Sequence, residues 1–283
     1  MEVDFVKISP TQNMTILVTS PAERHLHKEL AAKIMAYDNV YAEQVGFVEK
    51  PSDPKAAARL QMAGGEFCGN AALSLCAYLV WSGKVSCDAK SPASEAQIFS
   101  VPIEVSGADG IINCNIKRKG QHFLGKMNMP VPSSIKMFDL QIEGVSRTLP
   151  VVHLPGISHV IVETDETGIN KEAFAETLIE NSSHFSSEEA IGIMFYDKSS
   201  SSIIPFVCVK SSCTKVWERG CGSGTAATGA YLAFKSGGNF KMGISQPGGL
   251  IAVEVTAEDG KITNITIEGK IEIAAYGTAL LEI

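Results

Sequence analysis

The sequence contains two matching stretches, CGNAALSLCAYL at residues 68–79 and CGSGTAATGAYL at residues 221–232. They align without a gap, and Cys, Gly, Ala, Tyr and Leu recur at the same places. Each begins with a cysteine and small residues and continues as an apolar, helix-forming run. The pattern therefore predicts two buried helices in one chain, each with a thiol at its N-terminal end.

The elements expected around each stretch also recur in the same order, which indicates a duplicated unit. In both halves a β-rich run precedes a helix, a second strand follows, and the Cys helix comes next. The first half has these elements at residues 15–19, from Ser20-Pro21 onward, and at 44–48; the second half has them at 159–164, 171–180 and 190–196. Later segments at 262–267 and 271–274 read as two further strands.

The fold class expected from this order is α/β (α+β), with two pseudo-symmetric lobes. Each lobe is predicted to hold a mixed, mostly antiparallel, β-barrel-like sheet wrapped on one central helix. We expect an N-terminal lobe with Cys68 at residues 1–127 and a C-terminal lobe with Cys221 at residues 128–271. A final strand at about residues 272–283 is expected to return to the first lobe.

Composition narrows the possible partners and compartments. The 283 residues carry a net charge of −7 and no Lys/Arg block, so neither nucleic acid nor an anionic membrane is an expected partner. The apolar run 71–81 is too short to cross a bilayer, and the first residues lack an apolar signal core. Seven cysteines without regular spacing are typical of reduced thiols, so we expect a cytoplasmic protein.

Two thiols at two helix ends suggest a specific chemistry. A helix N-terminus binds anions and is expected to lower the pKa of a nearby thiol. If both halves act on one small carboxylate, one thiolate can remove a proton from the adjacent carbon while the opposite thiol returns one to the other face. This inverts a stereocentre without a cofactor. Backbone amides at Gly69-Asn70 and Gly222-Ser223 would hold the carboxylate.

Other interpretations of the same residues remain open at this point. A cysteine at a helix start is commonly a small buried residue, and duplication can copy a structural one. A non-catalytic amino-acid-binding or redox-sensing module would use Cys68 and Cys221 only to form a disulfide. No cluster at metal-ligand spacing is present, so no metal site is expected, and His153 and His159 are assigned to a turn and a strand. The remaining cysteines are expected to be packing residues, namely Cys76, Cys87, Cys114, Cys208 and Cys213.

Two motifs resemble those of a known family, and the order of the expected elements matches that family over essentially the whole chain. Residues FCGNA at 67–71 and ERGCGSGT at 218–225 resemble the two catalytic motifs of diaminopimelate epimerase. The resemblance implies a pyridoxal-independent enzyme of the two-lobed diaminopimelate epimerase-like fold, with Cys68 and Cys221 as the acid–base pair. It also implies that Glu218 accepts from the substrate ammonium and that Asn13, Gln44 and Arg219 belong to the substrate-binding set.

The chain departs from that family where the family holds the far end of its substrate. Three asparagines are replaced by residues that match Met62, Ile157 and Gly192. None of these can replace an amide that both donates and accepts hydrogen bonds. A second carboxylate would be left without a partner there, so diaminopimelate is not the expected substrate although Arg219 is retained.

A closer resemblance is to the histidine racemases that supply D-histidine to staphylopine-type metallophore biosynthesis. The shared phrases include NMTILV at 13–18, EQVGF at 43–47 and QPGG at 246–249. This resemblance implies a histidine racemase, with Glu43 either as the partner of a basic side chain or as a surface carboxylate. That group has Asn-Ser where this chain has Arg219-Gly220, so another amino acid, including diaminopimelate, stays an alternative substrate. An amino acid is the expected partner, and a homodimer is the expected assembly.

Overall fold

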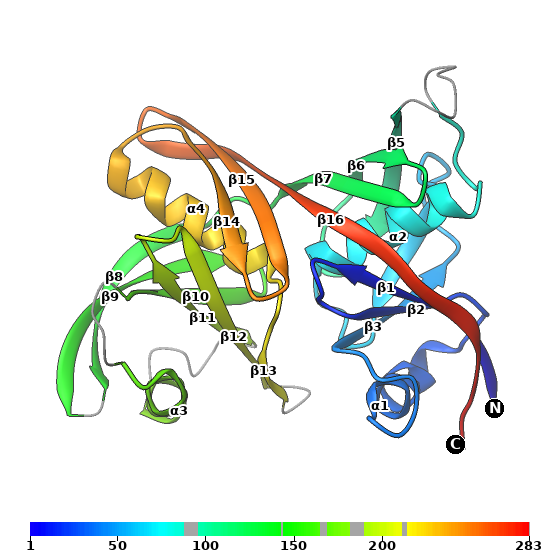
Figure 1. Ribbon diagram of the computed structural model, residues 1–283, viewed down its shortest axis with the longest axis horizontal. Helices are drawn as coiled ribbons and strands as arrows, with labels where there is room; N and C mark the ends of the chain where they lie inside the picture. The colour runs from blue at the N-terminus through cyan, green and yellow to red at the C-terminus, as the bar shows by residue number, and fades with distance from the viewer. Residues whose placement is uncertain (88–95, 143, 165–168, 182–189, 211–213, 283) are drawn as a thin grey trace. The chain divides into compact units, whose positions relative to one another are not determined.

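The computed structural model describes the chain except residues 88–95, 143, 165–168, 182–189, 211–213 and 283. It divides into two compact units, one formed by Met1–Asn128 with Glu268–Ile283 and the other by Met129–Ile267 (Figure 1). Each unit is a sheet with one helix at its centre. The predicted mixed α+β fold class is therefore confirmed.

The first unit is a closed ring of strands. Their order is β1-β2-β3-β4-β5-β6-β7-β16, and β16 pairs again with β1. The strands are β1 (Glu2–Pro10), β2 (Thr15–Val18), β3 (Gln44–Glu49), β4 (Ala58–Met62), β5 (Gln97–Val105), β6 (Ile111–Lys119), β7 (His122–Met129) and β16 (Lys261–Leu280). Both chain ends lie on this ring, where β1 and β16 run side by side (Figure 1).

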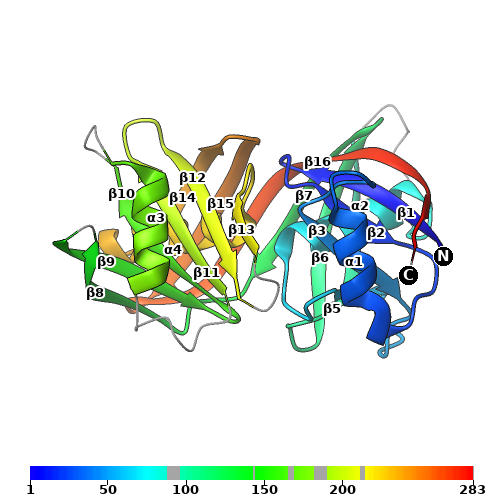
Figure 2. The same ribbon diagram turned by 90° about the horizontal axis from the view of Figure 1, so that it is seen from below.

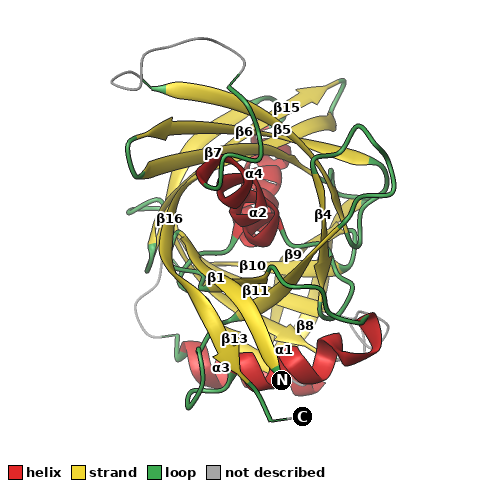
Figure 3. Cartoon of the chain, turned by 90° about the vertical axis from the view of Figure 1, so that its right-hand side faces the viewer, coloured by secondary structure: helices red, strands yellow, loops and turns green. Residues whose placement is uncertain are grey.

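Helix α2 (Gly69–Trp81) occupies the centre of this ring and contacts β1 through β6 (Figure 3). All of its residues except the last, Trp81, are buried. A helix that is apolar on every side must be covered on every side, which explains why the strands close around it. The first Cys stretch is thus the core element of its unit.

The second unit repeats this plan with α4 (Gly222–Ser236) at its centre. Its strand order is β16-β15-β14-β12-β11-β10-β9-β8, and β13 pairs with β12. The strands are β8 (Ser134–Ile142), β9 (Val145–Leu154), β10 (Ile157–Glu163), β11 (Ala190–Asp197), β12 (Ser202–Val209), β13 (Thr214–Trp217), β14 (Phe240–Gln246) and β15 (Gly249–Glu258). Helix α3 (Lys171–Asn181) covers the other face of β10 and β11 through Phe174 and Leu178 (Figure 2).

The topology repeats as the two Cys stretches predict. In the first unit β2 and β3 are parallel, joined through η1 (Arg24–Leu26) and α1 (His27–Met35), and in the second β10 and β11 are parallel, joined through α3. Helix α2 then lies between the parallel strands β4 and β5, and α4 lies between the parallel strands β12 and β14. The two units therefore share element order, strand direction and the place of the Cys helix.

Several local expectations are wrong. The first helix begins at Arg24 instead of at Pro21, because Ser20 Oγ accepts from the Asp4 N–H at 3.0 Å and the segment stays tied to β1. The two strands expected at 262–267 and 271–274 are one strand, β16, which continues without a break. His153 lies in β9 and not in a turn. Among the described residues, no helix is long and apolar enough to cross a membrane.

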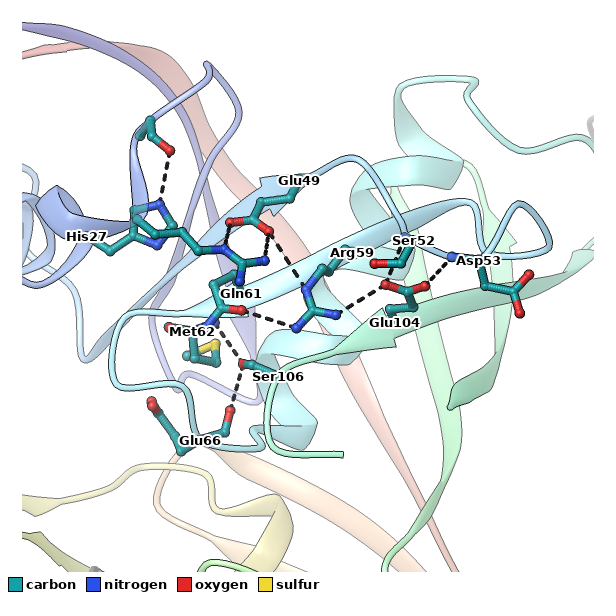
Figure 4. Close-up of polar contacts among 12 residues, drawn as sticks. His27, Glu49, Ser52, Asp53, Arg59, Gln61, Met62, Glu66, Glu104 and Ser106 are labelled. Carbon is teal, nitrogen blue, oxygen red and sulfur yellow. Dashed lines mark hydrogen bonds and ion pairs between the residues drawn. The ribbon is translucent and has the colours of Figure 1, made fainter. Parts of the chain in front are cut away.

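A buried carboxylate fixes the loop after β3 in the first unit (Figure 4). Glu104 accepts from the Ser52 N–H at 3.1 Å, the Asp53 N–H at 2.6 Å and Arg59 Nη1 at 3.2 Å. These backbone donors hold the pKa of Glu104 below its usual range. Arg59 also lies 3.7 Å from Glu49, so the network ties β3, β4 and β5 together.

Candidate active site

Both cysteines are N-cap residues with nearly the same backbone conformation. Cys68 has φ −132° and ψ 111°, and its Sγ accepts from the Ala71 N–H at 3.4 Å. Cys221 has φ −118° and ψ 108°, and its Sγ accepts from the Gly224 N–H at 3.2 Å. A side chain at the N-cap commonly satisfies one of the free amides of the first turn. Here sulfur takes that role twice, so each thiol is held at the positive end of its helix.

The turn directly after β5 holds the segment that leads into Cys68 (Figure 4). Ser106 Oγ accepts from the Met62 N–H and donates to the Glu66 carbonyl, both at 2.9 Å. Gly107 lies so close to this segment that a Cβ there would be 2.3 Å from the Phe67 nitrogen. The end of β4 and the entry to α2 are therefore held by the same two neighbouring residues.

The Cys68 thiol ends a chain of side-chain hydrogen bonds. Its Sγ donates to Gln44 Oε1 at 3.0 Å, and Gln44 Nε2 donates to Asn13 Oδ1 at 2.5 Å and to Thr15 Oγ1 at 2.7 Å. Asn13 Nδ2 donates to Glu43 Oε2 at 2.7 Å. The structure thus brings together four residues proposed from sequence. Thr15 was not among them, and only its position two residues after Asn13 on β2 could have indicated it.

The Cys221 backbone is held by a different arrangement. Gln246 Oε1 accepts from the Cys221 N–H at 2.7 Å, and Gln246 Nε2 donates to Thr225 Oγ1 at 2.7 Å. The Thr225 hydroxyl donates to the Cys221 carbonyl at 2.6 Å, and Ser223 Oγ lies 3.6 Å from the sulfur. In the sequence, Gln246 stands out only as the first residue of the QPGG phrase at 246–249. Its role follows from the register of β14 beside α4, which no local pattern reveals.

Glu218 and Arg219 lie between β13 and α4. The Glu218 N–H donates to the Pro205 carbonyl at 3.0 Å, which extends the pairing of β13 with β12. Arg219 is exposed, and its Nη2 donates to the Pro247 carbonyl at 3.1 Å. The Glu218 carboxylate lies beside the Cys221 thiol and accepts its hydrogen bond. Cys221 therefore has a charged acceptor in its own unit.

The acidity of Cys221 differs from the sequence expectation. Burial raises the pKa of the Cys221 thiol well above its usual range, and the charge of the nearby Glu218 raises it further. The Ser223 hydroxyl and the Gly224 N–H act in the opposite direction but are outweighed. The expected lowering by the helix end is therefore wrong for Cys221 in this state, because desolvation and a like charge prevail.

The four residues proposed to hold a carboxylate form the first turns of the two helices. Gly69 and Asn70 begin α2, and Gly222 and Ser223 begin α4. The first intrahelical backbone bonds come later, from the Ala72 N–H and its counterpart in α4. The first amides of a helix point out of its N-terminal end, where they can bind an anion. Both helices thus offer the same kind of anion site.

The three positions that replace family asparagines have different surroundings. Met62 is buried on β4, and Ile157 is half-buried at the start of β10. Gly192 lies on β11 directly opposite His159, and a Cβ there would be 2.1 Å from His159 Nδ1. Glycine at position 192 therefore makes room for the His159 ring, which would clash with any larger residue there.

His159 is fully buried, and neither ring nitrogen has a hydrogen-bond partner among the described residues. Burial lowers its pKa to about 3. A histidine in the unfolded chain titrates near pH 6.5. Between these values only the unfolded state binds the proton, so acid should favour unfolding.

We expect this histidine to weaken the fold below pH about 6.5, by up to about 1.4 kcal/mol per pH unit. Urea unfolding at a series of pH values should show a steeper loss of stability in the parent chain than in His159→Leu. Replacing the exposed His25 in the same way should leave the parent slope unchanged. Parallel curves for the parent and His159→Leu would contradict this account.

The other candidates from sequence do not form a further site. Within the described ranges, no three His, Cys, Asp or Glu side chains gather as they would around a metal ion. His153 Nδ1 lies 2.7 Å from Ser158 Oγ. Cys76, Cys114 and Cys208 are buried, Cys87 is half-buried, and Cys213 lies outside the described residues.

The chain is similar to known proteins along almost its whole length. The family model described as the histidine racemase CntK N-terminal domain matches residues 2–280. A histidine racemase of Fusobacterium nucleatum is 34% identical, over 97% of this chain and 96% of that protein. A histidine racemase of Staphylococcus aureus is 27% identical, over 99% of this chain and 98% of that protein.

Solved structures share the fold at low sequence identity. A hydroxyproline epimerase from Agrobacterium vitis superposes with a TM-score of 0.71 at 14% identity, over 99% of this chain and 93% of that one. The superposition shows a shared fold, and the sequence matches show the family. With its paired N-cap cysteines and its full-length match, the chain belongs to the histidine racemase family.

Proposed function

We propose that the protein is a cofactor-independent histidine racemase that moves a proton at Cα between Cys68 and Cys221. The observation that carries the proposal is the repeated N-cap thiol, held in the same way at the start of two buried helices. Racemisation needs an acid and a base on opposite faces of one carbon, and a pair of thiols supplies both. The family match supports histidine as the substrate.

The proposed reaction is a proton exchange that needs no redox step. One cysteine, as thiolate, takes the proton from Cα, and the electron pair delocalises into the substrate carboxylate. The other cysteine, as thiol, returns a proton to the opposite face and becomes the thiolate. The amides of Gly69-Asn70 and Gly222-Ser223 would stabilise the charge that builds on the carboxylate.

The remaining residues of the proposed site recognise the rest of the substrate. Glu218 would accept from the ammonium, while Asn13, Gln44, Ser223 and Arg219 would line the pocket. Glu43 supplies a carboxylate that suits a basic imidazole side chain. The apolar residues and glycine at the three former asparagine positions argue against a second carboxylate on the substrate.

A substrate comparison tests this assignment. The purified chain, without pyridoxal phosphate, should convert L-histidine to D-histidine as measured by chiral chromatography. We expect kcat/KM for histidine to exceed that for diaminopimelate and for other common amino acids by at least about tenfold, the lower limit for a side chain that differs by one methylene in a pocket. Absence of D-histidine, or faster turnover of diaminopimelate, would contradict the assignment.

Three further features stay proposals. A cytoplasmic location is supported by cysteines without disulfide-like spacing, which suit a reducing compartment. A role in metallophore biosynthesis rests on the resemblance to the racemases that supply such pathways. The homodimer also remains a prediction.

A further inference from the structure

We infer that the Glu43 carboxylate fixes the proton of Cys68 on its sulfur, acting through the oriented amides of Asn13 and Gln44. All these residues lie in the first unit, and each link is a hydrogen bond of that unit. Glu43 and Thr15 are positioning residues in this account, because they act on Cys68 only through other side chains. The inference deepens the proposed function and rests on it for its catalytic meaning.

The first link sets the direction of the Asn13 amide. An ionised carboxylate accepts hydrogen bonds and donates none. Glu43 Oε2 therefore requires a donor, and Asn13 Nδ2 supplies it at 2.7 Å. The opposite rotamer would put Asn13 Oδ1 against the carboxylate, so two acceptors would face each other. The Asn13 oxygen is consequently directed to Gln44.

The second link sets the direction of the Gln44 amide. Asn13 Oδ1 needs a donor and receives one from Gln44 Nε2 at 2.5 Å. The other Gln44 Nε2 hydrogen goes to Thr15 Oγ1 at 2.7 Å, because the Thr15 hydroxyl itself donates to the Asn13 carbonyl at 3.2 Å. Both amide hydrogens are therefore used, and only Gln44 Oε1 is left to face Cys68.

The third link sets the state of the thiol. Gln44 Oε1 is an acceptor, and the Cys68 sulfur lies 3.0 Å from it. An S–H donates across this distance, whereas a thiolate would put two acceptors in contact. A hydrogen bond that only the neutral form can make disfavours the charged form. The network therefore favours Cys68 as a thiol, which must lose its proton before it can act as the base of the proposed reaction.

The Asn13 and Thr15 part of this network is closed to water, whereas Glu43, Gln44 and Cys68 are half-buried. Asn13 is 1% exposed and Thr15 is fully buried. An amide that reversed its direction there would have no solvent to satisfy its groups, so the orientation is costly to change. The second unit differs, since Glu218 itself accepts from the Cys221 thiol and Gln246 binds the Cys221 backbone. Among the described residues, the link through two neutral amides is found at Cys68.

Other charged groups lie on the strands around α2. The structure describes hydrogen bonds and ion pairs for Asp4, Lys7, Glu49 and Arg59 on these strands. Their partners are residues other than Cys68 and Gln44. The ionisable groups on these strands and before the helix are Glu2, Asp4, Lys7, Glu49, Arg59, Glu104, Cys114, Lys117, Arg118, Lys119 and Glu66.

Alkylation of Cys68 as a function of pH tests the inference without substrate or turnover. Iodoacetamide reacts with the thiolate, so the midpoint of the rate profile reports when Cys68 loses its proton. The full-length chain would be compared with Glu43→Gln and Asn13→Ala, and mass spectrometry would follow the Cys68 peptide. Glu49→Gln at the far end of β3 is the matched control, since it removes a carboxylate that bonds to Arg24.

In Glu43→Gln the new amide can also donate, so Asn13 and Gln44 can reverse and offer Gln44 Nε2 to the thiolate. In Asn13→Ala the link is removed while Glu43 keeps its charge. We expect both midpoints to fall by about one pH unit, which makes Cys68 about tenfold more reactive below the midpoint. Glu49→Gln should keep the parent midpoint.

Two outcomes would overturn the inference. One is an unchanged midpoint in both variants. The other is a fall in Glu43→Gln alone, which would mean that the Glu43 charge acts directly through space. If Asn13→Ala does not fold, Gln44→Leu decides, because it removes the amide that faces Cys68 while Glu43 keeps its charge, and an unchanged midpoint there would overturn the inference. The alkylation midpoints are measured without substrate, so they do not depend on whether the protein racemises histidine. Failure of the proposed function and failure of this inference are therefore distinguishable.

Discussion

Replacing Cys68 or Cys221 by serine is expected to abolish racemisation. A hydroxyl is a far weaker acid than a thiol and its alkoxide is not formed near neutral pH, so serine cannot act as the base. Loss of one positioned acid–base group costs about 100-fold to 10,000-fold in rate. Inversion needs both groups in every turnover, so either variant alone should lose D-histidine formation from L-histidine in a chiral assay.

The two variants should differ in what they retain. With one thiol left, a proton can still leave and return on that face of Cα, so each variant should exchange the Cα hydrogen of one enantiomer with deuterium oxide. The two variants should select opposite enantiomers. Cys87→Ser is the matched control, since Cys87 is half-buried outside the Cys helices and should be dispensable. A Cys68→Ser or Cys221→Ser protein that racemises at the parent rate would refute the two-thiol mechanism.

Gly224→Ala should impair catalysis more than stability. A Cβ at this position would lie 2.2 Å from Met194 Sδ and 3.0 Å from Cys221 Sγ. The Gly224 N–H also binds that sulfur, so the strain reaches the thiol directly. Overpacking should cost about 1–3 kcal/mol in the free energy of unfolding. Displacement of the thiol by about 1 Å should lower kcat about 100-fold, as measured by initial rates of histidine racemisation.

Gly229→Ala on the same helix is the control for overpacking alone. A Cβ there would lie 2.6 Å from Val253 Cγ2, which is side chain and not part of the Cys221 surroundings. We expect a similar loss in the free energy of unfolding and a kcat close to that of the parent. Equal losses of kcat in the two variants would show that the damage comes from the fold and not from the thiol.

The fold could be predicted to the extent that it depends on local and repeated patterns. The two Cys stretches predict two buried helices, and the recurrence of elements around them predicts the duplicated plan. The single long strand β16 could not be predicted, because its continuity depends on pairing with distant strands such as β1. The late start of the first helix has the same origin, since Ser20 binds Asp4 across the sheet.

The candidate site shows the same division. Cys68 and Cys221 follow from the repeat, and Asn13, Glu43 and Gln44 follow from family phrases. Their order in a directed chain of hydrogen bonds does not follow, because it depends on Thr15 and on the register of β2 against β3. The raised pKa of Cys221 likewise depends on burial and on a carboxylate brought near by the fold. Such effects are properties of packing in three dimensions and leave no periodic trace in sequence.

The most direct measurement is the early fate of the Cα hydrogen when L-histidine is incubated with the enzyme in deuterium oxide. Two thiols on opposite faces predict that the first D-histidine formed carries deuterium at Cα, while the L-histidine recovered at the same time retains its original hydrogen. Thiol protons come from solvent before each turnover, so the proton removed by one cysteine is not the one delivered by the other. D-histidine that retains the original hydrogen, or deuterium that enters recovered L-histidine first, would contradict the exchange between Cys68 and Cys221.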